Sequence, residues 1–511
     1  MNYADLFRVT LPETALEVAA LLVLVVDLAF LRKAEHRVRA VSAALLGVAG
    51  CVAGLWFVLT AAPGGLSAGS ELLLATGGSA TVAQAGILLL TALTLFLLVD
   101  SVFTRHVGEY VAVVLMSAAG GLLIASAQDL LVIFIGLELL SLGLYILTAF
   151  AKLSGKSAEA AMKYYLFGGM SAAFLLFGFS YLYGLTGTTN LPGVMQEIHH
   201  STASGADAVL LVALVMIAAG LGFKVAAVPF HLWAPDTYEG APAPAAAFIA
   251  SVSKVASFAL LISIGMAGLH TIENVPGNLS GAASGYETFN GPWSIVLIVL
   301  SLASMLVGNL AALAQISVRR LLAYSAIAHA GYMLLALAFI SHTNAGTNAV
   351  LYYILTYGLT TIGAFGAVGA VERATGSDRM DAFLGLHKRN PLLAAVLLVL
   401  FLSLAGIPPL VGFWAKFNLF AAVLAVGAGW VPFALVALAV AMSAVSLYYY
   451  LQVLKRVYVM PAVDDPADRA DRVEVHPVTM AVLLLIAAAV VVMGCFPSLL
   501  QSWIASFSPA M

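Results

Sequence analysis

The sequence predicts an all-α polytopic membrane protein with about 14 transmembrane helices, because runs of about 20 apolar residues, enough to cross the hydrocarbon core, recur along the chain. Of its 511 residues, 62% are hydrophobic and only 9% are charged. A soluble domain carries about 25% charged residues. Glycine and alanine are frequent inside the apolar runs, which suits close helix packing in lipid.

The first apolar run follows the segment MNYADLFRVTLPETALE. This segment lacks the basic region of a cleavable signal peptide, so we expect the run after it to remain as the first membrane helix. Several later junctions are tight, and Gln128 and Asp129 supply the only polar break between the fourth and fifth spans. In chain order, the expected spans are 13–31, 39–61, 80–103, 110–128, 129–150, 159–185, 207–233, 243–268, 293–315, 321–341, 347–371, 391–424, 430–455 and 478–503.

The distribution of lysine and arginine supports this count. Of 22 such residues, 17 fall in loops on one side of the membrane, and the opposite loops carry none. Only Arg8, in the N-terminal tail, lies on that opposite side. The positive-inside rule then predicts that the 17 face the cytoplasm and that both termini face outward. The 17 are Arg32, Lys33, Arg37, Arg39, Arg105, Lys152, Lys156, Arg319, Arg320, Arg373, Arg379, Lys388, Arg389, Lys455, Arg456, Arg469 and Arg472.

Four lysines fall inside the expected spans: Lys163, Lys224, Lys254 and Lys416. A charged side chain near the bilayer centre costs about 2.5–3.5 kcal/mol on insertion scales, so such residues usually have a function. Lys224 and Lys254 lie near the middle of their spans. Lys163 lies close to a span end, one turn after Glu159, so it either relays protons or extends to the interface as an i,i+4 ion pair.

Three further ionisable residues lie in or beside these spans. Glu138 is central in the fifth span and has no cation on its own helix, so it either tunes a nearby lysine or is a protonated structural group. His231 follows Lys224 by about two helical turns, which predicts one shared face about 10 Å apart; the alternative is an interfacial histidine. His329, near mid-membrane, either relays protons or is a satisfied core histidine.

Two spans are interrupted by helix-breaking residues. Pro229 interrupts the seventh span, which frees a carbonyl near Lys224 and indicates a hydrated cavity. Gly406, Pro408, Pro409 and Gly412 interrupt the twelfth, just before Lys416. Broken helices five spans apart predict two inverted five-helix repeats, helices 4–8 and 9–13.

This repeat divides the chain into four regions. They are an N-terminal three-helix region (1–109), a first repeat (110–268), a second inverted repeat (269–457), and a C-terminal loop with the last helix (458–511). The two longest loops, near 186–206 and 269–292, are expected on the outer side and are too short for a soluble domain.

The sequence argues against a redox centre or nucleotide site in this chain. Cys51 and Cys495 lie alone in apolar runs, without the spacing of an Fe–S cluster or zinc site. There is no GxGxxG after a strand and no Walker loop. We therefore expect no cofactor and no metal here, and no nucleic acid partner.

The interrupted segments resemble those of a known family. GFKVAAVPFHLWAPDTYEGAPAP, AYSAIAHAGY and AGIPPLVGFWAKF resemble the seventh-, tenth- and twelfth-helix signatures of the antiporter-like subunits of respiratory complex I and of multi-subunit cation/proton antiporters. The resemblance covers nearly the whole chain. It is strongest to the N-type subunit of NADH-quinone oxidoreductase, because Lys416 stands where the M-type has glutamate and no long lateral helix follows helix 14.

The resemblance implies a proton-translocating membrane subunit in the bacterial inner membrane, coupled to quinone reduction elsewhere in the complex. NADH, FMN, Fe–S clusters and quinone would belong to other subunits, and the membrane partners would be an M-type subunit and small K-, J- and A-type subunits. The resemblance also implies which residues carry protons. The main groups of the path would be Glu138, Lys224, Lys254 and Lys416, and the relays would be Lys163, His231 and His329.

The hypothesis for the path starts from the cytoplasm at Lys224, with Glu138 as its switch. It continues to Lys254, past His329, to Lys416 and out. The alternative is a subunit of a Na⁺(K⁺)/H⁺ antiporter. The sequence leaves open the electron donor, the kind of quinone and the coupling ion.

Overall fold

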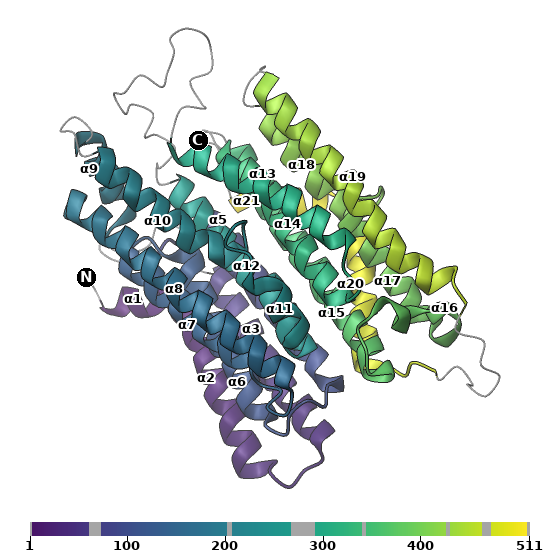
Figure 1. The fold of residues 1–511 in the computed structure, drawn as a ribbon. Coiled ribbons are helices and arrows are strands. Elements are labelled where there is room, and N and C mark those ends of the chain that lie inside the picture. The colour runs from purple at the N-terminus through teal and green to yellow at the C-terminus, as the bar shows by residue number, and fades with distance from the viewer. Residues whose placement is uncertain are drawn as a thin grey trace.

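The structure is a computed structural model that describes residues 3–60, 73–201, 207–266, 292–339, 344–425, 430–461 and 472–507. Within these ranges the chain is helical, and its only β-type pairing is three isolated bridges. Figure 1 shows long helices lying side by side along a common direction. The expected loop near 269–292 and Arg469 lie outside the described residues, apart from Pro292, which begins a helix.

Among the described residues, twelve helices are long and apolar enough to cross a membrane, which confirms a polytopic helical membrane protein. Each overlaps an expected span, and all but α10 and α20 match its limits within a few residues. They are α3 (His36–Thr60), α5 (Gly78–Leu97), α6 (Val107–Ser126), α7 (Leu130–Thr148), α8 (Gly155–Thr186), α10 (Asp207–Val225), α12 (Ala243–Met266), α13 (Pro292–Leu313), α14 (Val318–Ala338), α15 (Asn344–Thr375), α19 (Trp430–Tyr458) and α20 (Pro477–Cys495).

The first and twelfth expected spans are each built from two shorter pieces. Helix α2 (Leu11–Val25) continues directly into the π-helix η1 (Val26–Phe30). Helix α17 (Pro391–Ala405) and helix α18 (Val411–Ala425) are separated by the predicted glycine–proline break. Pro391 stands at the start of α17, where its missing N–H costs nothing, and Asn390 caps that end.

The structure differs from expectation in several connecting segments. The stretch near 186–206, expected as a loop, contains helix α9 (Leu191–Ser201). The last expected span, 478–503, is not one helix, because Pro497 follows the end of α20 and a separate α21 (Ser498–Phe507) begins after it. The remaining short elements are α1 (Tyr3–Val9), η2 (Leu98–Asp100), α11 (Trp233–Gly240), η5 (Met380–Phe383) and α16 (Leu386–Arg389).

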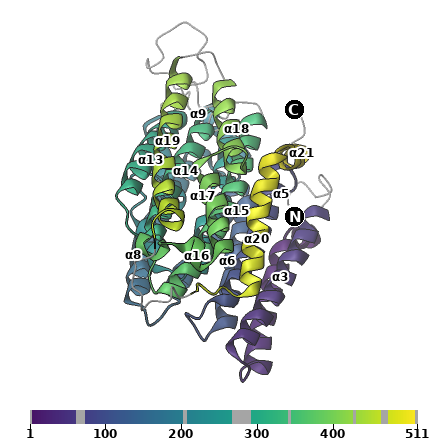
Figure 2. The same ribbon diagram turned by 90° about the vertical axis from the view of Figure 1, so that its right-hand side faces the viewer.

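Helices α12, α14 and α15 form the enclosed centre of the bundle. In each of them 94% of the most apolar 18-residue window is buried inside the chain, against 22% in α19. Figure 2 shows α20 running along the edge of the bundle next to α15, with α21 across its end. Ionisable side chains on the three central helices are therefore surrounded by protein and not by lipid.

Glycines allow the neighbouring helices to approach closely. A Cβ atom at Gly120 of α6 would lie 2.6 Å from the backbone nitrogen of Leu140 on α7. A Cβ atom at Gly308 of α13 would lie 2.6 Å from the backbone nitrogen of Ala328 on α14. Two helix pairs thus depend on the same close backbone contact, which is typical of packing in membranes.

One end of the bundle, here called the basic end, is held together by charged side chains from the basic loops. Arg39 pairs with the buried Asp27 at 2.6 Å, and the Asp27 carboxylate also accepts from the backbone N–H of Gly108. Arg373 pairs with Asp100 at 2.6 Å. These contacts join α3 to η1 and α6, and α15 to η2.

Candidate functional site

Three of the four predicted membrane lysines are buried in the interior of the protein. The side chains of Lys224, Lys254 and Lys416 are 8%, 2% and 6% exposed, respectively. They come from α10, α12 and α18, which are distant in the sequence. Each ammonium has at least one hydrogen-bond acceptor and lies near the face of an aromatic ring, which compensates part of its lost hydration.

Lys224 is bound to α7 next to Glu138. Its Nζ donates to the Ser141 hydroxyl at 2.6 Å, and that hydroxyl donates to the Leu137 carbonyl. Glu138 lies one helical turn before Ser141 and interacts electrostatically with Lys224. The described residues contain no direct ion pair between the two, so Ser141 holds the ammonium while the carboxylate acts from a greater distance.

The break after Lys224 begins with a helix-ending backbone motif. Ala226 adopts a left-handed conformation (φ 60°), and the N–H of Ala227 donates to the Gly222 carbonyl at 2.7 Å. The Trp233 indole N–H donates to the Phe223 carbonyl at 3.0 Å. The tryptophan is therefore a second donor to the Phe223 carbonyl, which also accepts from the Ala226 N–H at 3.0 Å.

The predicted geometry of His231 is wrong. Helix α10 ends at Val225, so the two-turn helical spacing from Lys224 does not apply. His231 is 9% exposed and lies in the turn before α11, and its Nδ1 has no hydrogen-bond partner among the described residues. It is thus a buried histidine of the break.

Lys254 lies at the centre of the bundle. Its Nζ donates to the Ala326 carbonyl of α14 at 2.5 Å and lies 5.5 Å from the centre of the Tyr357 ring on α15. Its side chain thus touches both of the other enclosed helices. No carboxylate pairs with it among the described residues.

His329 lies between Lys254 and Lys416, and it interacts electrostatically with both. Its Nδ1 is 2.7 Å from the Tyr353 hydroxyl, and the Tyr357 ring lies 4.9 Å from its own. Its Nε2 is buried without a hydrogen-bond partner among the described residues. A histidine with one free nitrogen between two lysines is suited to pass a proton between them.

Lys416 fills the break between α17 and α18. Its Nζ donates to the Ala405 carbonyl at 2.9 Å and to the Ser443 hydroxyl at 2.8 Å. It lies 5.6 Å from the centre of the Tyr332 ring, and Tyr332 contacts His329 edge to face. The lysine therefore caps the last carbonyl of α17 while it stays connected to the central histidine.

Lys163 is placed apart from the other three lysines. Its Nζ lies 2.7 Å from both Glu159 and Asp236 at the basic end, and its side chain is 40% exposed. Arg320 pairs with Asp236 at 2.6 Å and with Glu239 at 3.0 Å. The predicted i,i+4 ion pair is present, inside a larger network that joins α8, α11 and α14.

This network perturbs the carboxylate that it surrounds. Burial alone would raise the pKa of Asp236, but hydrogen bonds from Lys163 and Arg320 outweigh burial and lower the pKa below its ordinary value of 3.8. Asp236 is therefore ionised at neutral pH and ties α11 to its neighbours.

The structure thus brings five of the seven predicted site residues into two linked groups, together called the row. Glu138 interacts electrostatically with Lys224, and His329 interacts electrostatically with both Lys254 and Lys416. His231 lies in the break next to the row, and Lys163 lies in the network at the basic end. The groups in the row can hold and release protons, whereas no described cluster of His, Cys, Asp or Glu could hold a metal ion.

The sequence alone did not identify the hydroxyl partners of this row. Serine and tyrosine are common in apolar helices, so nothing in the sequence marks these residues as partners of a lysine or histidine. They are Ser141, Ser443, Tyr353 and Tyr357. The Asp236 network was also missed, although its carboxylate lies in the segment WAPDTYEG right after the break. The position of Asp236 directly after an interrupted helix is the sequence feature that could have revealed this network.

Comparison with known proteins gives consistent matches. Residues 127–276 and 279–443 match the family described as NADH:quinone oxidoreductase/Mrp antiporter, TM. The chain is 47% identical to NADH-quinone oxidoreductase subunit N 2 of Acidobacterium capsulatum over 514 aligned residues, which cover 99% of each protein.

Two solved structures have a similar fold. A chain of respiratory complex I from Thermus thermophilus with bound aureothin superposes with a TM-score of 0.75 at 32% identity, covering 96% of this chain and 98% of that one. A chain of the Mrp complex from Dietzia sp. gives a TM-score of 0.75 at 21% identity, covering 99% and 98%, which shows likeness of fold alone.

Proposed function

This chain belongs to the NADH:quinone oxidoreductase/Mrp antiporter transmembrane family, and on that premise we propose that it is the N-type, proton-translocating membrane subunit of an NADH:quinone oxidoreductase. It acts as part of an enzyme complex. The observation that carries the proposal is the enclosed row of Lys224, Lys254, His329 and Lys416, in a chain nearly half identical to an N-type subunit over its full length.

The row supplies a physical route for protons. The amines of the buried lysines can each hold a proton, and hydroxyls or a histidine near them provide intermediate positions. Lys224 receives a proton under the influence of Glu138, and Lys254 passes it to His329 and Lys416. Movement of Glu138 relative to Lys224 is the proposed switch.

Lys163 and His231 take supporting roles in this scheme. Lys163 is ion-paired at the basic end, which favours a role in holding α8 to α11 close to the entrance. His231 lies in the break, and its Nδ1, which has no hydrogen-bond partner among the described residues, is available for a relay between Lys224 and Lys254.

We further infer fourteen transmembrane helices and two inverted repeats. The twelve long helices plus the α2–η1 and α17–α18 pairs make up that number. The second break begins with the same backbone motif as the first. Gly406 has a left-handed conformation, and the N–H of Ile407 donates to the Leu402 carbonyl. Gly120 is separated from Gly308 by the same number of residues as Asp129 is from Ser317.

Matching motifs at opposite ends support the inversion. Asp129 starts α7 and accepts from the Thr189 hydroxyl, at the end opposite to the basic end. Ser317 starts α14 and donates to the Asp378 carboxylate, at the basic end itself. Each pair is accompanied by an isolated β-bridge between the same two segments.

The positive-inside rule assigns the basic end to the cytoplasm and both termini to the outer side of a bacterial inner membrane. The membrane partners proposed for the chain are an M-type subunit and small K-, J- and A-type subunits. NADH, FMN, Fe–S clusters and quinone are assigned to other subunits of the complex.

The test is to purify the assembly through a tag on this chain and reconstitute it in vesicles. NADH oxidation with a quinone should acidify the vesicle interior without requiring sodium. An assembly that lacks NADH:quinone activity but exchanges Na⁺ or K⁺ for protons would contradict the proposal and favour the antiporter alternative.

A further inference from the structure

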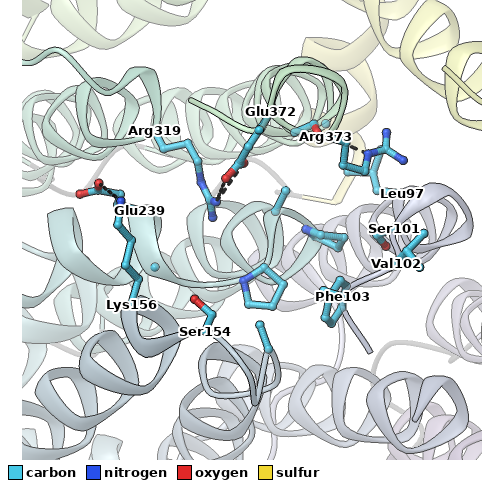
Figure 3. A pocket seen from close by; sticks show the side chains of 18 of the residues that line it. Leu97, Ser101, Val102, Phe103, Ser154, Lys156, Glu239, Arg319, Glu372 and Arg373 are labelled. Carbon is cyan, nitrogen blue, oxygen red and sulfur yellow. Dashed lines mark hydrogen bonds and ion pairs between the residues drawn. The ribbon is translucent and has the colours of Figure 1, made fainter. Parts of the chain in front are cut away.

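A large cavity opens at the basic end, away from the proposed proton row. It has a volume of about 620 Å³ and is lined by residues of α5, α8, α11, α12, α14, α15 and α20 together with the connecting segments (Figure 3). None of the seven predicted site residues lines it. Its function is therefore separate from the proposed path.

The cavity contains a buried guanidinium with an unused donor. Arg319 is 4% exposed, pairs with Glu372 at 3.1 Å and donates to the Ala241 carbonyl. Its Nε has no hydrogen-bond partner among the described residues. Figure 3 shows this side chain extending into the middle of the view, between Lys156 and Arg373.

The surroundings of Arg319 favour an anion. Three cationic side chains and two carboxylates line the cavity, and the third cation, Arg373, pairs with Asp100, so the unused Arg319 donor and the nearby helix starts supply the attraction. Ser154 and Lys156 mark the start of the 32-residue helix α8, and Ala243 begins the 24-residue α12. The first N–H groups of a helix have no acceptor inside it and carry a partial positive charge, so both helix starts add to the positive potential.

The cavity also has an apolar wall. Leu97, Val102, Phe103 and Ala151 line it, and Val102 is 79% exposed. A free phosphate ion would use only a small part of 620 Å³ and would leave this wall in contact with water. A cationic centre beside an apolar wall at the basic end of a membrane bundle suits a phospholipid head group with part of its acyl chain.

We propose that this cavity binds a phosphate group, and that its occupant is an anionic phospholipid whose phosphate lies between Arg319 and the first turn of α12. Lys156, 73% exposed and held only by a 3.3 Å contact with Glu239, turns toward the head group when the lipid binds. The lipid thereby fills the space between the two proposed repeats and the N-terminal helices.

The test uses the assembled complex, stripped of lipid and titrated with vesicles of phosphatidylglycerol or of neutral phosphatidylcholine. Lys156→Gln should weaken retention of phosphatidylglycerol about fivefold, the factor that corresponds to about 1 kcal/mol for one basic residue at a charged membrane surface. Lys152→Gln is the matched control, because Lys152 is an exposed lysine near the same helix start that does not line the cavity. It should leave retention unchanged.

A second pair of variants examines the buried donor. Arg319→Lys keeps the charge and removes the Nε–H, so it should also reduce phosphatidylglycerol retention, whereas Arg320→Lys should not. Bound lipid is counted by native mass spectrometry. Equal retention by Lys156→Gln and Lys152→Gln would overturn the site, and displacement by millimolar inorganic phosphate would overturn the lipid as its occupant.

Discussion

Substitution of Gly412 by alanine should disturb the second break and the lysine that fills it. A Cβ atom at this position would lie 1.8 Å from the Ser403 carbonyl oxygen and 2.7 Å from the carbonyl carbon. Both are backbone atoms, so α17 and α18 must separate. Lys416 follows one turn later on α18 and would move with it.

The expected magnitude follows from the size of this clash. Overpacking of a tight helix contact costs about 1–3 kcal/mol. A displacement of about 1 Å at a group that takes part in the chemistry can reduce rate about 100-fold. We therefore expect a lower thermal midpoint of the complex and at least a tenfold loss of NADH-driven proton translocation, about 1.4 kcal/mol in barrier.

Gly169→Ala is the matched control, because a Cβ atom at that position of α8 would meet nothing within 4 Å. Proton translocation is measured by vesicle acidification and stability by thermal inactivation of quinone reduction. If Gly412→Ala behaved like Gly169→Ala in both measurements, the close contact at the break would not position Lys416.

Three further predictions concern individual hydrogen bonds. Ser443→Ala removes one of two acceptors of the Lys416 ammonium, a bond to a charged group worth about 1.5–3 kcal/mol, and should slow proton translocation in vesicles while the complex still assembles. Trp233→Phe leaves the Phe223 carbonyl without its indole donor, so it should lower the thermal midpoint, and an unchanged midpoint would contradict that role. Asp236→Asn should destabilise the complex near neutral pH. Because the folded pKa is lowered from 3.8, the stabilising effect is present above that value and disappears as the pH falls below it, so the two proteins should have equal thermal stability in strong acid.

The sequence predicts the helices well, because twenty-residue apolar runs and polar breaks follow directly from bilayer thickness. It also locates both interruptions, since proline and glycine have a fixed effect on a helix. It fails where short elements depend on local contacts, as with α9 near residue 191 or the separate α21 after Pro497.

The site is predictable in part for similar reasons. A lysine inside a membrane span is rare because placing its charge there costs free energy. Lys224, Lys254 and Lys416 could therefore be identified from the sequence for that reason alone. The positions of these lysines relative to one another could not be predicted, because they depend on how α10, α12 and α18 pack. The expected face shared by Lys224 and His231 was wrong because the helix ends at Val225, a boundary that Pro229 indicates only approximately.

If protons cross the membrane through the enclosed row, removal of one of its charges must impair their translocation. The most direct test is the number of protons translocated per NADH oxidised by the reconstituted complex carrying Lys254→Met, which removes the charge and keeps most of the apolar volume. Lys152→Met, on an exposed loop, serves as its control. We expect a reduced proton-to-electron ratio, or quinone reduction slowed together with translocation, for Lys254→Met alone. A full ratio at the wild-type rate of quinone reduction would contradict it.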